Sequence, residues 1–313
     1  MWAYVLRRIL ATFPVLAIVA FVVFSILHLA PGDPAAVIAG DQATPQQIEQ
    51  IRANLGLDRP FVEQFAIYVG NVLRGDFGTS IFSNQPVTRL FWQRVEPTVA
   101  LTVTTTIVTL LLAIPIGVLA AWKAGSWIDR LVMSFAVLGF SFPVFVVGYM
   151  LIYVFSIQLG WLPVQGYRPL SDGFWPFLRH LILPSLALGL SFMALIARIT
   201  RASVLEVLSQ DHIRTVRAKG VPTRGLLFDH ALPNAAVPIL TIVGVGVAIL
   251  LGGVVVTESV FAIPGLGRLV VDAILHRDYP VIQGVLLIFS AVYVLINLLV
   301  DLLYVVFDPR IRY

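Results

Sequence analysis

Six stretches of this sequence are apolar, contain no Asp, Glu, Lys or Arg, and approach or exceed the length that a membrane crossing requires. They cover residues 9–30, 97–122, 131–159, 181–197, 235–257 and 279–300. A helix needs about 20 apolar residues to span the hydrocarbon core of a bilayer, and it satisfies its own backbone polar groups there. Only 12% of the 313 residues are charged, whereas soluble domains carry roughly 25%. We therefore predict an all-α polytopic membrane protein with six transmembrane helices.

The first stretch follows Arg7 and Arg8, as the apolar region of a secretory signal follows its basic start. It is long for a signal, however, and Pro31 and Pro34 occupy the place where a peptidase needs an extended backbone. We expect this first helix to be retained.

Lys and Arg are distributed unevenly among the segments that connect the stretches. Twelve of the 21 fall in residues 1–8, 123–130, 198–232 and 308–313, although these segments are together shorter than those on the other side. Cytoplasmic loops of membrane proteins carry the excess of basic residues. We predict that both ends of the chain lie inside the cell. We attribute the net charge of +4 to this bias and not to binding of nucleic acid.

The segment between the first two stretches is long for a connecting loop and has helical features. Thr44 followed by Pro45 is typical of a helix start, and apolar residues recur after it. We predict a small outside subdomain there. The domain organisation is then residues 1–30 as the inner end and first helix, residues 31–96 as the outside segment, and residues 97–313 as a core with five helices.

The polar segment before the fifth stretch is where we expect functional chemistry. Ser209 to Lys219 is predicted to form a short helix, with Asp211 near its positive end and Arg217 near its negative end. Gly220 then ends the helix. A charged helix of this kind suits docking to a protein partner, and it also suits a position on anionic lipid. The residues alone leave both interpretations open.

Motifs that would power transport or catalyse a reaction are missing from the sequence. It contains no G-x-x-x-x-G-K-[ST], no H-E-x-x-H, no G-x-S-x-G and no cysteine. Asp301, which we expect at the interface or paired with Arg310 or Arg312, borders the last stretch. We predict a passage that is not an enzyme and holds no cofactor or metal. The alternatives, a secondary transporter or channel and a membrane-embedded enzyme, require buried ionisable or nucleophilic groups.

Small and hydroxyl-bearing residues within the stretches have two interpretations each. Glycines on the fifth stretch permit close helix packing or line a cavity. Hydroxyl groups on the second and third stretches line a pore or bond their own backbone. The residues concerned are Gly244, Gly246, Gly252, Gly253, Thr104, Thr105, Thr106 and Ser141.

The inside segment also carries a spaced pattern. Residues 211–220 read DHIRTVRAKG, and His230-Ala231-Leu232-Pro233 follows after nine residues. This pattern resembles the EAA loop of binding-protein-dependent ABC importers, in which a three-residue block, three residues, Gly and nine residues precede I-x-L-P. Gly220, Leu232 and Pro233 match in register, whereas Arg214-Thr215-Val216 replaces the E-A-A block and His230 replaces isoleucine. These departures are similar to those of the peptide-importing branch.

Further stretches resemble the same branch, the dipeptide, oligopeptide, glutathione and nickel permeases of the first-subunit type. The similarity runs in order along the whole chain, so that it is more specific than any single motif. The stretches are LAPGDP (29–34), LGLDRP (55–60), GDFGTS (75–80), LGWLP (159–163), LPSL (183–186), PGLGR (264–268), RDYP (277–280) and DPRIRY (308–313).

The resemblance implies a type I ABC importer permease fold with an extra periplasmic segment after the first helix, in a bacterial inner membrane. The implied partners are a second homologous permease, two ABC ATPase subunits that bind ATP and magnesium, and an extracytoplasmic substrate-binding protein. Dipeptides or short oligopeptides are the expected substrates, with glutathione or a nickel chelate as alternatives.

The resemblance also implies two sites. A coupling loop over residues 201–233 would contact the ATPase, and we expect apolar contacts from Ile213, Val216, Val221 and Leu226 to supply much of the docking energy. The coupling residues are Asp211, His212, Arg214, Thr215, Arg217, Ala218, Lys219, Gly220, Leu232 and Pro233. A turn-rich outer loop would touch the binding protein or gate the pore, and its residues are Phe261, Pro264, Gly265, Gly267 and Arg268.

Overall fold

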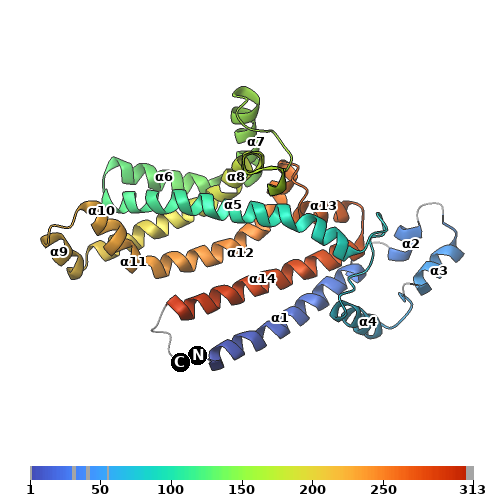
Figure 1. The fold of residues 1–313 in the computed structure, drawn as a ribbon. Coiled ribbons are helices and arrows are strands. Elements are labelled where there is room, and N and C mark those ends of the chain that lie inside the picture. Colours follow the sequence, from blue (N-terminus) through green and yellow to red (C-terminus); the bar gives the residue numbers. More distant parts are fainter. Residues whose placement is uncertain (1, 30–32, 40–42, 55, 308–313) are drawn as a thin grey trace. The chain divides into compact units, whose positions relative to one another are not determined.

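The computed structural model describes residues 2–29, 33–39, 43–54 and 56–307 (Figure 1). These residues are mostly helical and contain no strand beyond an isolated bridge between Thr79 and Pro86. Within the described residues, four helices are long and apolar enough to cross a membrane, or six if each of two bent helix pairs is one span. The predicted all-α membrane fold is confirmed, and the larger number agrees with the six spans predicted.

The chain forms two compact units, which we describe separately. The first consists of residues 1–95 and 268–298, and the second is centred on residues 96–267. The helices of the first unit are α1 (Trp2–Leu29), α2 (Pro34–Ala39), α3 (Pro45–Asn54), α4 (Phe61–Leu73), most of α13 (Leu266–Leu275) and most of α14 (Tyr279–Phe307).

In the first unit, α14 is joined to α1 by a buried amide. The side chain of Gln283 donates hydrogen bonds to the main-chain carbonyls of Val23 and Phe24, at 3.4 and 3.2 Å. The predicted outside segment follows α1 in the sequence and precedes most of α5, and its described residues include the short helices α2, α3 and α4. The predicted subdomain is therefore helical, although its placement outside the cell stays a prediction.

A capping box begins α3 where the sequence predicted a helix start. The Thr44 amide donates to Gln47 Oε1 at 2.8 Å, and the Gln47 amide donates to Thr44 Oγ1 at 3.3 Å. Pro45 occupies the first helical position, where its missing N–H has no intrahelical role. The prediction for this helix start is confirmed.

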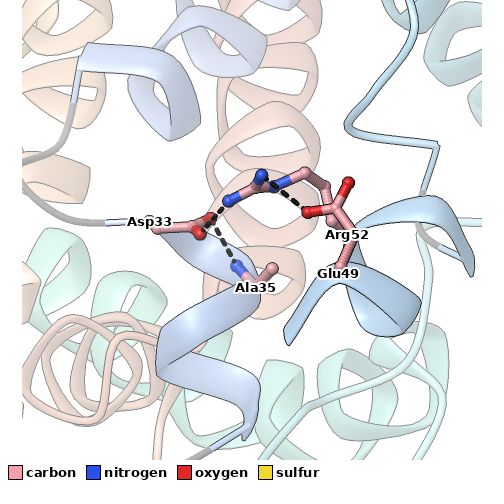
Figure 2. A network of polar contacts seen from close by, with 4 residues as sticks. All are labelled: Asp33, Ala35, Glu49 and Arg52. Atoms are coloured by element: carbon pink, nitrogen blue, oxygen red, sulfur yellow. Dashed lines mark hydrogen bonds and ion pairs between the residues drawn. The ribbon is translucent and has the colours of Figure 1, made fainter. Parts of the chain in front are cut away.

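A carboxylate links α2 to α3, as Figure 2 shows. Asp33 accepts hydrogen bonds from the Ala35 amide at 3.0 Å and from Arg52 Nη2 at 2.5 Å, while Arg52 Nη1 also bonds Glu49 at 2.9 Å. The hydrogen bond from Arg52 holds the pKa of Asp33 below its usual value. This small network of polar contacts links the two short helices.

Two of the motifs quoted above for the family resemblance meet in the first unit. The hydroxyl of Ser80, at the end of GDFGTS, donates to Asp278 Oδ2 at 2.5 Å, and the Ile81 amide donates to Asp278 Oδ1 at 3.1 Å. Both Ser80 and Asp278 are buried. The carboxylate of the RDYP motif therefore holds the turn that precedes α5.

The second unit is built around the long helix α8 (Phe174–Leu208). Around it lie α5 (Val87–Trp122), α6 (Trp127–Ser141), α7 (Val144–Leu151) and α12 (Ala236–Val260). Two-thirds of the most apolar window of α8 is buried, a larger share than in the other three long apolar helices. Such all-round burial identifies α8 as the core of the unit. The other elements are η1 (Ile152–Gln158), η2 (Leu170–Asp172), α9 (Asp211–Ala218), α10 (Thr223–Gly225), η3 (Leu226–Ala231) and α11 (Leu232–Asn234).

Close helix packing is the observed role of two glycines on α12. A Cβ at Gly246 would overlap the ring of Phe192 on α8, and one at Gly253 would lie 2.8 Å from Leu188. Gly252, by contrast, has open space beside it. The packing interpretation therefore holds for Gly246 and Gly253.

The hydroxyls on α5 and α6 mostly bond their own backbone. Thr104 and Thr106 donate to carbonyls one turn earlier, at 2.7 and 2.8 Å. Ser141 does the same on α6, at 3.1 Å. These contacts support the self-bonding interpretation and leave no donor from these three groups for a pore.

The predicted third span, over residues 131–159, is interrupted at its middle. α6 ends at Ser141, and α7 with η1 continues from Val144 at an angle of 109°. Phe142 between them is extended (φ −94°, ψ 129°), because proline disfavours the helical conformation in the residue before it. Pro143 also lacks the N–H that a continuing helix would use. The two halves together have the composition of one broken span or a re-entrant segment.

Several other boundaries differ from those predicted. α5 begins at Val87, ahead of the predicted start at residue 97, and α8 extends on both sides of the predicted 181–197. Both helices continue beyond their apolar stretches into segments that contain polar residues. The end of an apolar stretch is therefore not the end of the helix. The side chain of Asp301 on α14, together with Arg310 and Arg312, lies outside the described residues.

Candidate functional site: the predicted coupling loop and the predicted outer loop

The predicted coupling helix is present as α9. It begins after Gln210, whose backbone is extended, with Asp211 in its first turn and Arg217 in its last. Asp211 also pairs with Arg214 one turn on, at 3.2 Å. Gly220 ends the helix with a φ of +78°, a conformation that only glycine adopts without strain. The predicted stop is confirmed.

The apolar side of α9 faces the core of its own unit. Ile213 is 1% exposed and belongs to a cluster that joins α9 to the ends of α5, α8 and α12. Other buried members are Val118, Ala121, Val204, Val207, Leu226, Leu227, Ala231, Ala235 and Ile239. The expectation that Ile213 and Leu226 dock onto a partner is therefore wrong. These side chains already hold the loop against its own helices.

The exposed side of α9 is polar and basic. All the predicted coupling residues on α9 and up to Gly220 are exposed: Asp211, His212, Arg214, Thr215, Arg217, Ala218, Lys219 and Gly220. Phe228, on the adjacent element η3, is 42% exposed. Polar side chains and one aromatic ring thus form the surface that a partner would meet.

The predicted pair Leu232 and Pro233 lies in the return from α9 to α12. Leu232 is half-buried against the apolar cluster that contains Ile213, and Pro233 is exposed. Pro233 has no N–H to continue the helical ladder, and the side chain of Asn234 donates instead to the carbonyl of His230 at 2.7 Å. α12 starts after this break, bent by 64° from the segment before it.

An ion pair fixes the base of the loop. Arg201 on α8 makes a two-pronged contact with Asp129 on α6, at 2.5 and 2.7 Å, and the Gly125 amide donates to the same carboxylate at 2.9 Å. Asp129 is buried. The contact ties the turn between α5 and α6 to the helix that leads directly into α9.

The predicted outer loop is folded over a buried carboxylate. Glu258, in the last turn of α12, has no exposed surface and accepts a hydrogen bond of 2.5 Å from the hydroxyl of Thr98 on α5. The same hydroxyl accepts from the amide of Leu266, at 2.8 Å. A Cβ at Gly265 would overlap the Glu258 carboxylate, whereas one at Gly267 would lie 2.6 Å from the backbone of Val255 and 3.0 Å from Glu258. Glu258 therefore requires Gly265, and the close approach of Val255 requires Gly267.

The predicted outer-loop residues do not form one exposed patch. Phe261, Gly265 and Gly267 are buried, whereas Pro264 is exposed. Arg268 begins the first-unit part of α13 and lies 3.9 Å from Asp272. The carbonyl of Phe261 accepts from the Gly166 amide at 2.8 Å. Only part of the predicted loop is therefore placed to touch a partner.

Tyr167, which follows Gly166 in the sequence, also lies close to the predicted outer loop. The hydroxyl of Tyr167 donates to Glu96 at 3.0 Å. Burial, and the hydrogen bond to that carboxylate, raise the pKa of Tyr167 well above its usual value. Tyr167 therefore remains a neutral donor at every physiological pH.

Comparison with known proteins places the chain in a family. Residues 113–313 match the family model described as the binding-protein-dependent transport system inner membrane component, and residues 1–113 match the N-terminal model of the same kind of component. The chain belongs to this family of ABC importer permeases. The predicted family is confirmed.

Two relatives are similar in sequence to the permease over almost its full length. A probable peptide ABC transporter permease of Sinorhizobium fredii is 54% identical over 313 residues and is covered completely, as is this chain. The glutathione transport system permease GsiC of Escherichia coli strain K12 is 47% identical over 310 residues, with 99% of each chain covered. Both relatives are permeases by name.

Solved structures show the same fold. The MetNI methionine ABC transporter in an inward-facing conformation matches with a TM-score of 0.59 and 20% identity, over 71% of this chain and 97% of that chain. An amino acid ABC transporter crystallised with histidines matches with a TM-score of 0.51 and 20% identity, over 72% and 95%. The predicted type I importer permease fold is confirmed.

The permease contains functional candidates that the sequence analysis missed. Glu258 directly follows the predicted fifth stretch, and a carboxylate next to Thr257 and ahead of two glycines was a readable signal. Asp129 and Arg201 were counted only as loop residues or as inside charges. No periodicity connects them, because their contact joins positions 72 residues apart.

Proposed function

We propose that this permease carries dipeptides or short oligopeptides into the cell. The support is the name of the Sinorhizobium fredii relative, a probable peptide permease with 54% identity along the whole chain. Glutathione, itself a tripeptide, is the second candidate substrate, because the permease GsiC is 47% identical. Nickel chelates were a third expectation, and neither relative's name points to them.

The proposed assembly pairs the permease with a second permease, two ATPase subunits and an extracytoplasmic binding protein in a bacterial inner membrane. ATP and magnesium would bind to the ATPases. The observation that carries this proposal is α9, whose apolar side is buried in the permease while its polar side is exposed. A helix held this firmly can transmit a push from a partner to the helices behind it.

The exposed basic residues of α9 and the ring of Phe228 would form the contact with the ATPase. Exposed ion pairs contribute only about 0–1 kcal/mol each, whereas a buried aromatic anchor often dominates an interface. Arg217→Glu with Lys219→Glu, and separately Phe228→Ala, should reduce the ATPase recovered with the permease. Arg130→Glu, an exposed residue on α6, is the control. Unchanged recovery in both test variants would remove α9 and η3 from the interface.

Purification tests the assembly as a whole. The tagged permease is isolated in mild detergent, and the retained proteins are identified by mass spectrometry. A second permease and P-loop ATPases are the expected partners. Their absence, together with ATP-independent transport by the chain alone in liposomes, would overturn the importer assignment. A retained binding protein can then be tested for peptides and for glutathione by calorimetry.

The proposed orientation places α9 inside the cell and the segment after α1 outside. The chain contains no native cysteine, so Gln47→Cys and Thr215→Cys each provide a single reactive site. Both positions are exposed. An impermeant maleimide added to intact spheroplasts should label position 47 and spare position 215. Labelling of both from the same side would reject the orientation.

A further inference from the structure

α4 carries more apolar surface than a helix in water needs. One stripe, formed by Phe61, Phe65 and Tyr68, packs its rings on Phe21 and Phe24 of α1. The ring centroids lie 5.2 to 6.0 Å apart. This stripe accounts for the attachment of α4 to α1, which Figure 1 shows side by side.

A second apolar stripe lies next to the first and is largely left uncovered by the described residues; of its four members only Val69 is half-buried. Val62, Ala66, Val69 and Leu73 follow one another at spacings of four, three and four, which places them on one side of a helix. Val62 is 76% exposed and Leu73 is 83% exposed. Water is a poor solvent for such a stripe.

The attachment to α1 sets the depth of α4 in the membrane. The apolar part of α1 runs over 21 residues, from Ile9 to Leu29. At a rise of 1.5 Å per residue it just covers the about 30 Å hydrocarbon core. Phe21 therefore lies about 12 Å along the helix from Leu29. Because α4 contacts Phe21, part of α4 lies below the level at which α1 leaves the membrane.

Glu63 and Asn71 are the exposed polar side chains within α4, on the side away from both stripes, where Ile67 between them is 42% exposed. Arg74 directly follows the helix. Before the helix, Arg59 pairs with Glu63 at 2.9 Å. Arginines at both ends suit phosphate head groups, which they reach while their stems stay in apolar surroundings.

We propose that α4 is an interfacial helix embedded in the lipid leaflet into which α1 opens at its C-terminal end. The stripe of Val62, Ala66, Val69 and Leu73 faces acyl chains, and Glu63 and Asn71 face the head groups. Thirteen residues are too few to span the bilayer. The permease is thus anchored in that leaflet, the outer one in the proposed orientation, by a helix outside its spanning core.

Lipid is favoured over a protein partner by the chemistry of the stripe. It contains no charge and no hydrogen-bonding side chain, and it lies at a depth where phospholipid is the surrounding solvent. Interfaces between membrane proteins are enriched instead in small residues and interhelical hydrogen bonds. The stripe has bulky Val62 and Leu73 at its two ends.

Spin labelling distinguishes lipid from water and from protein. Single cysteines at Val62, Ala66 and Leu73 are labelled with a nitroxide in the complete transporter complex, reconstituted in phosphatidylcholine–phosphatidylglycerol nanodiscs. Relaxation by oxygen, which concentrates in lipid, is compared with relaxation by a water-soluble nickel chelate. We expect oxygen to dominate at these three positions. The ratio should reverse at Asn71 and at Glu49 on α3, the water-exposed control.

Two outcomes would overturn the proposal. Dominance of the nickel chelate at Val62 and Leu73 would place the stripe in water. An immobilised label shielded from both reagents would place it against another protein chain. Ala66→Cys changes little volume, so that it reports even if one of the larger substitutions disturbs α4.

Discussion

The hydroxyl of Thr98 lies 2.5 Å from Glu258 Oε1 and 2.8 Å from the amide of Leu266, so that one side chain on α5 joins two parts of the outer loop. All three residues are buried. A buried polar group that loses its partner costs about 1–3 kcal/mol. We expect Thr98→Val to destabilise the outer loop by that order, because the carboxylate and the amide would both lose this hydroxyl.

Hydrogen exchange followed by mass spectrometry measures the effect locally. Peptides that cover residues 258–268 should exchange faster in Thr98→Val, while peptides from α9 should not change. Thr98→Ser keeps the hydroxyl and is the matched control. Equal exchange in the valine and serine variants would show that the hydrogen bonds do not hold the loop.

Glu258→Gln separates the charge of the carboxylate from its shape. The amide oxygen of glutamine still accepts from Thr98, and its volume fits beneath Gly265. We expect the loop to keep its exchange protection if hydrogen bonding and packing determine its position. A loss of protection in Glu258→Gln comparable to that in Thr98→Val would assign the role to the negative charge, because the acceptor remains in place.

The sequence predicted the elements that depend on local chemistry. The capping box at Thr44, the end of α9 at Gly220 and the apolar helices all follow from neighbouring residues. It failed where a tertiary contact decides. The burial of Ile213 depends on the ends of α5, α8 and α12, and no local pattern distinguishes a side chain that packs inward from one that docks onto a partner. The break at Phe142 was readable from Pro143, but it was outweighed by the apolar composition on both sides.

The ion pair between Asp129 and Arg201 should stabilise the base of the coupling loop. Removal of one partner of a fully buried pair costs about 3–5 kcal/mol. Arg201 is 25% exposed, so that water offsets part of the loss, and we expect a smaller effect here. Asp129→Asn and Arg201→Gln should each lower the thermal midpoint of the purified complex. The double variant should be more stable than the sum of the two losses predicts.

Arg130→Gln, next to Asp129 and exposed, is the control for the loss of a positive charge at this end of α6. Strictly additive effects of Asp129→Asn and Arg201→Gln would contradict the pairing.

Uptake and ATP hydrolysis are measured in parallel. If the pair carries motion from α9 to α6, uptake should fall more than hydrolysis does.

Gly220 permits a clean test of backbone strain. A Cβ at this position would meet nothing within 4 Å, so that the effect of substitution comes from its φ of +78° alone. A left-handed conformation costs an ordinary residue about 1–2 kcal/mol, and asparagine tolerates it better. We expect Gly220→Val to reduce ATPase recovery with the permease, and Gly220→Asn to retain most of it.

Gly160 is a matched control for that experiment. Its φ is +65° and it too has open space beside it, but it lies in the segment after η1 and away from α9. Gly160→Val should leave ATPase recovery unchanged. Equal loss in both valine variants would indicate general misfolding and would count against a specific role for the end of α9.

The contact between Asp33 and Arg52 should make the pairing of α2 with α3 sensitive to acid. The pKa of Asp33 is lowered, chiefly by its hydrogen bond with Arg52. A carboxyl group with a lowered pKa stabilises the folded state fully above its unfolded-state pKa, and that stabilisation is lost as pH falls through the folded value. The ordinary pKa of an aspartate carboxyl is about 3.9. The pairing should therefore persist from neutral pH down to this value and weaken below it.

Distance measurements between nitroxides at Ala36 on α2 and Gln50 on α3 follow the pairing. The wild-type distribution should stay narrow from pH 7 to the ordinary carboxyl pKa and broaden at lower pH. Asp33→Asn, which cannot carry the charge, should already be broad at pH 7. Glu49→Gln is the control, since Glu49 contacts Arg52 only within α3. A narrow distribution in Asp33→Asn at pH 7 would show that other contacts hold α2 and α3 together.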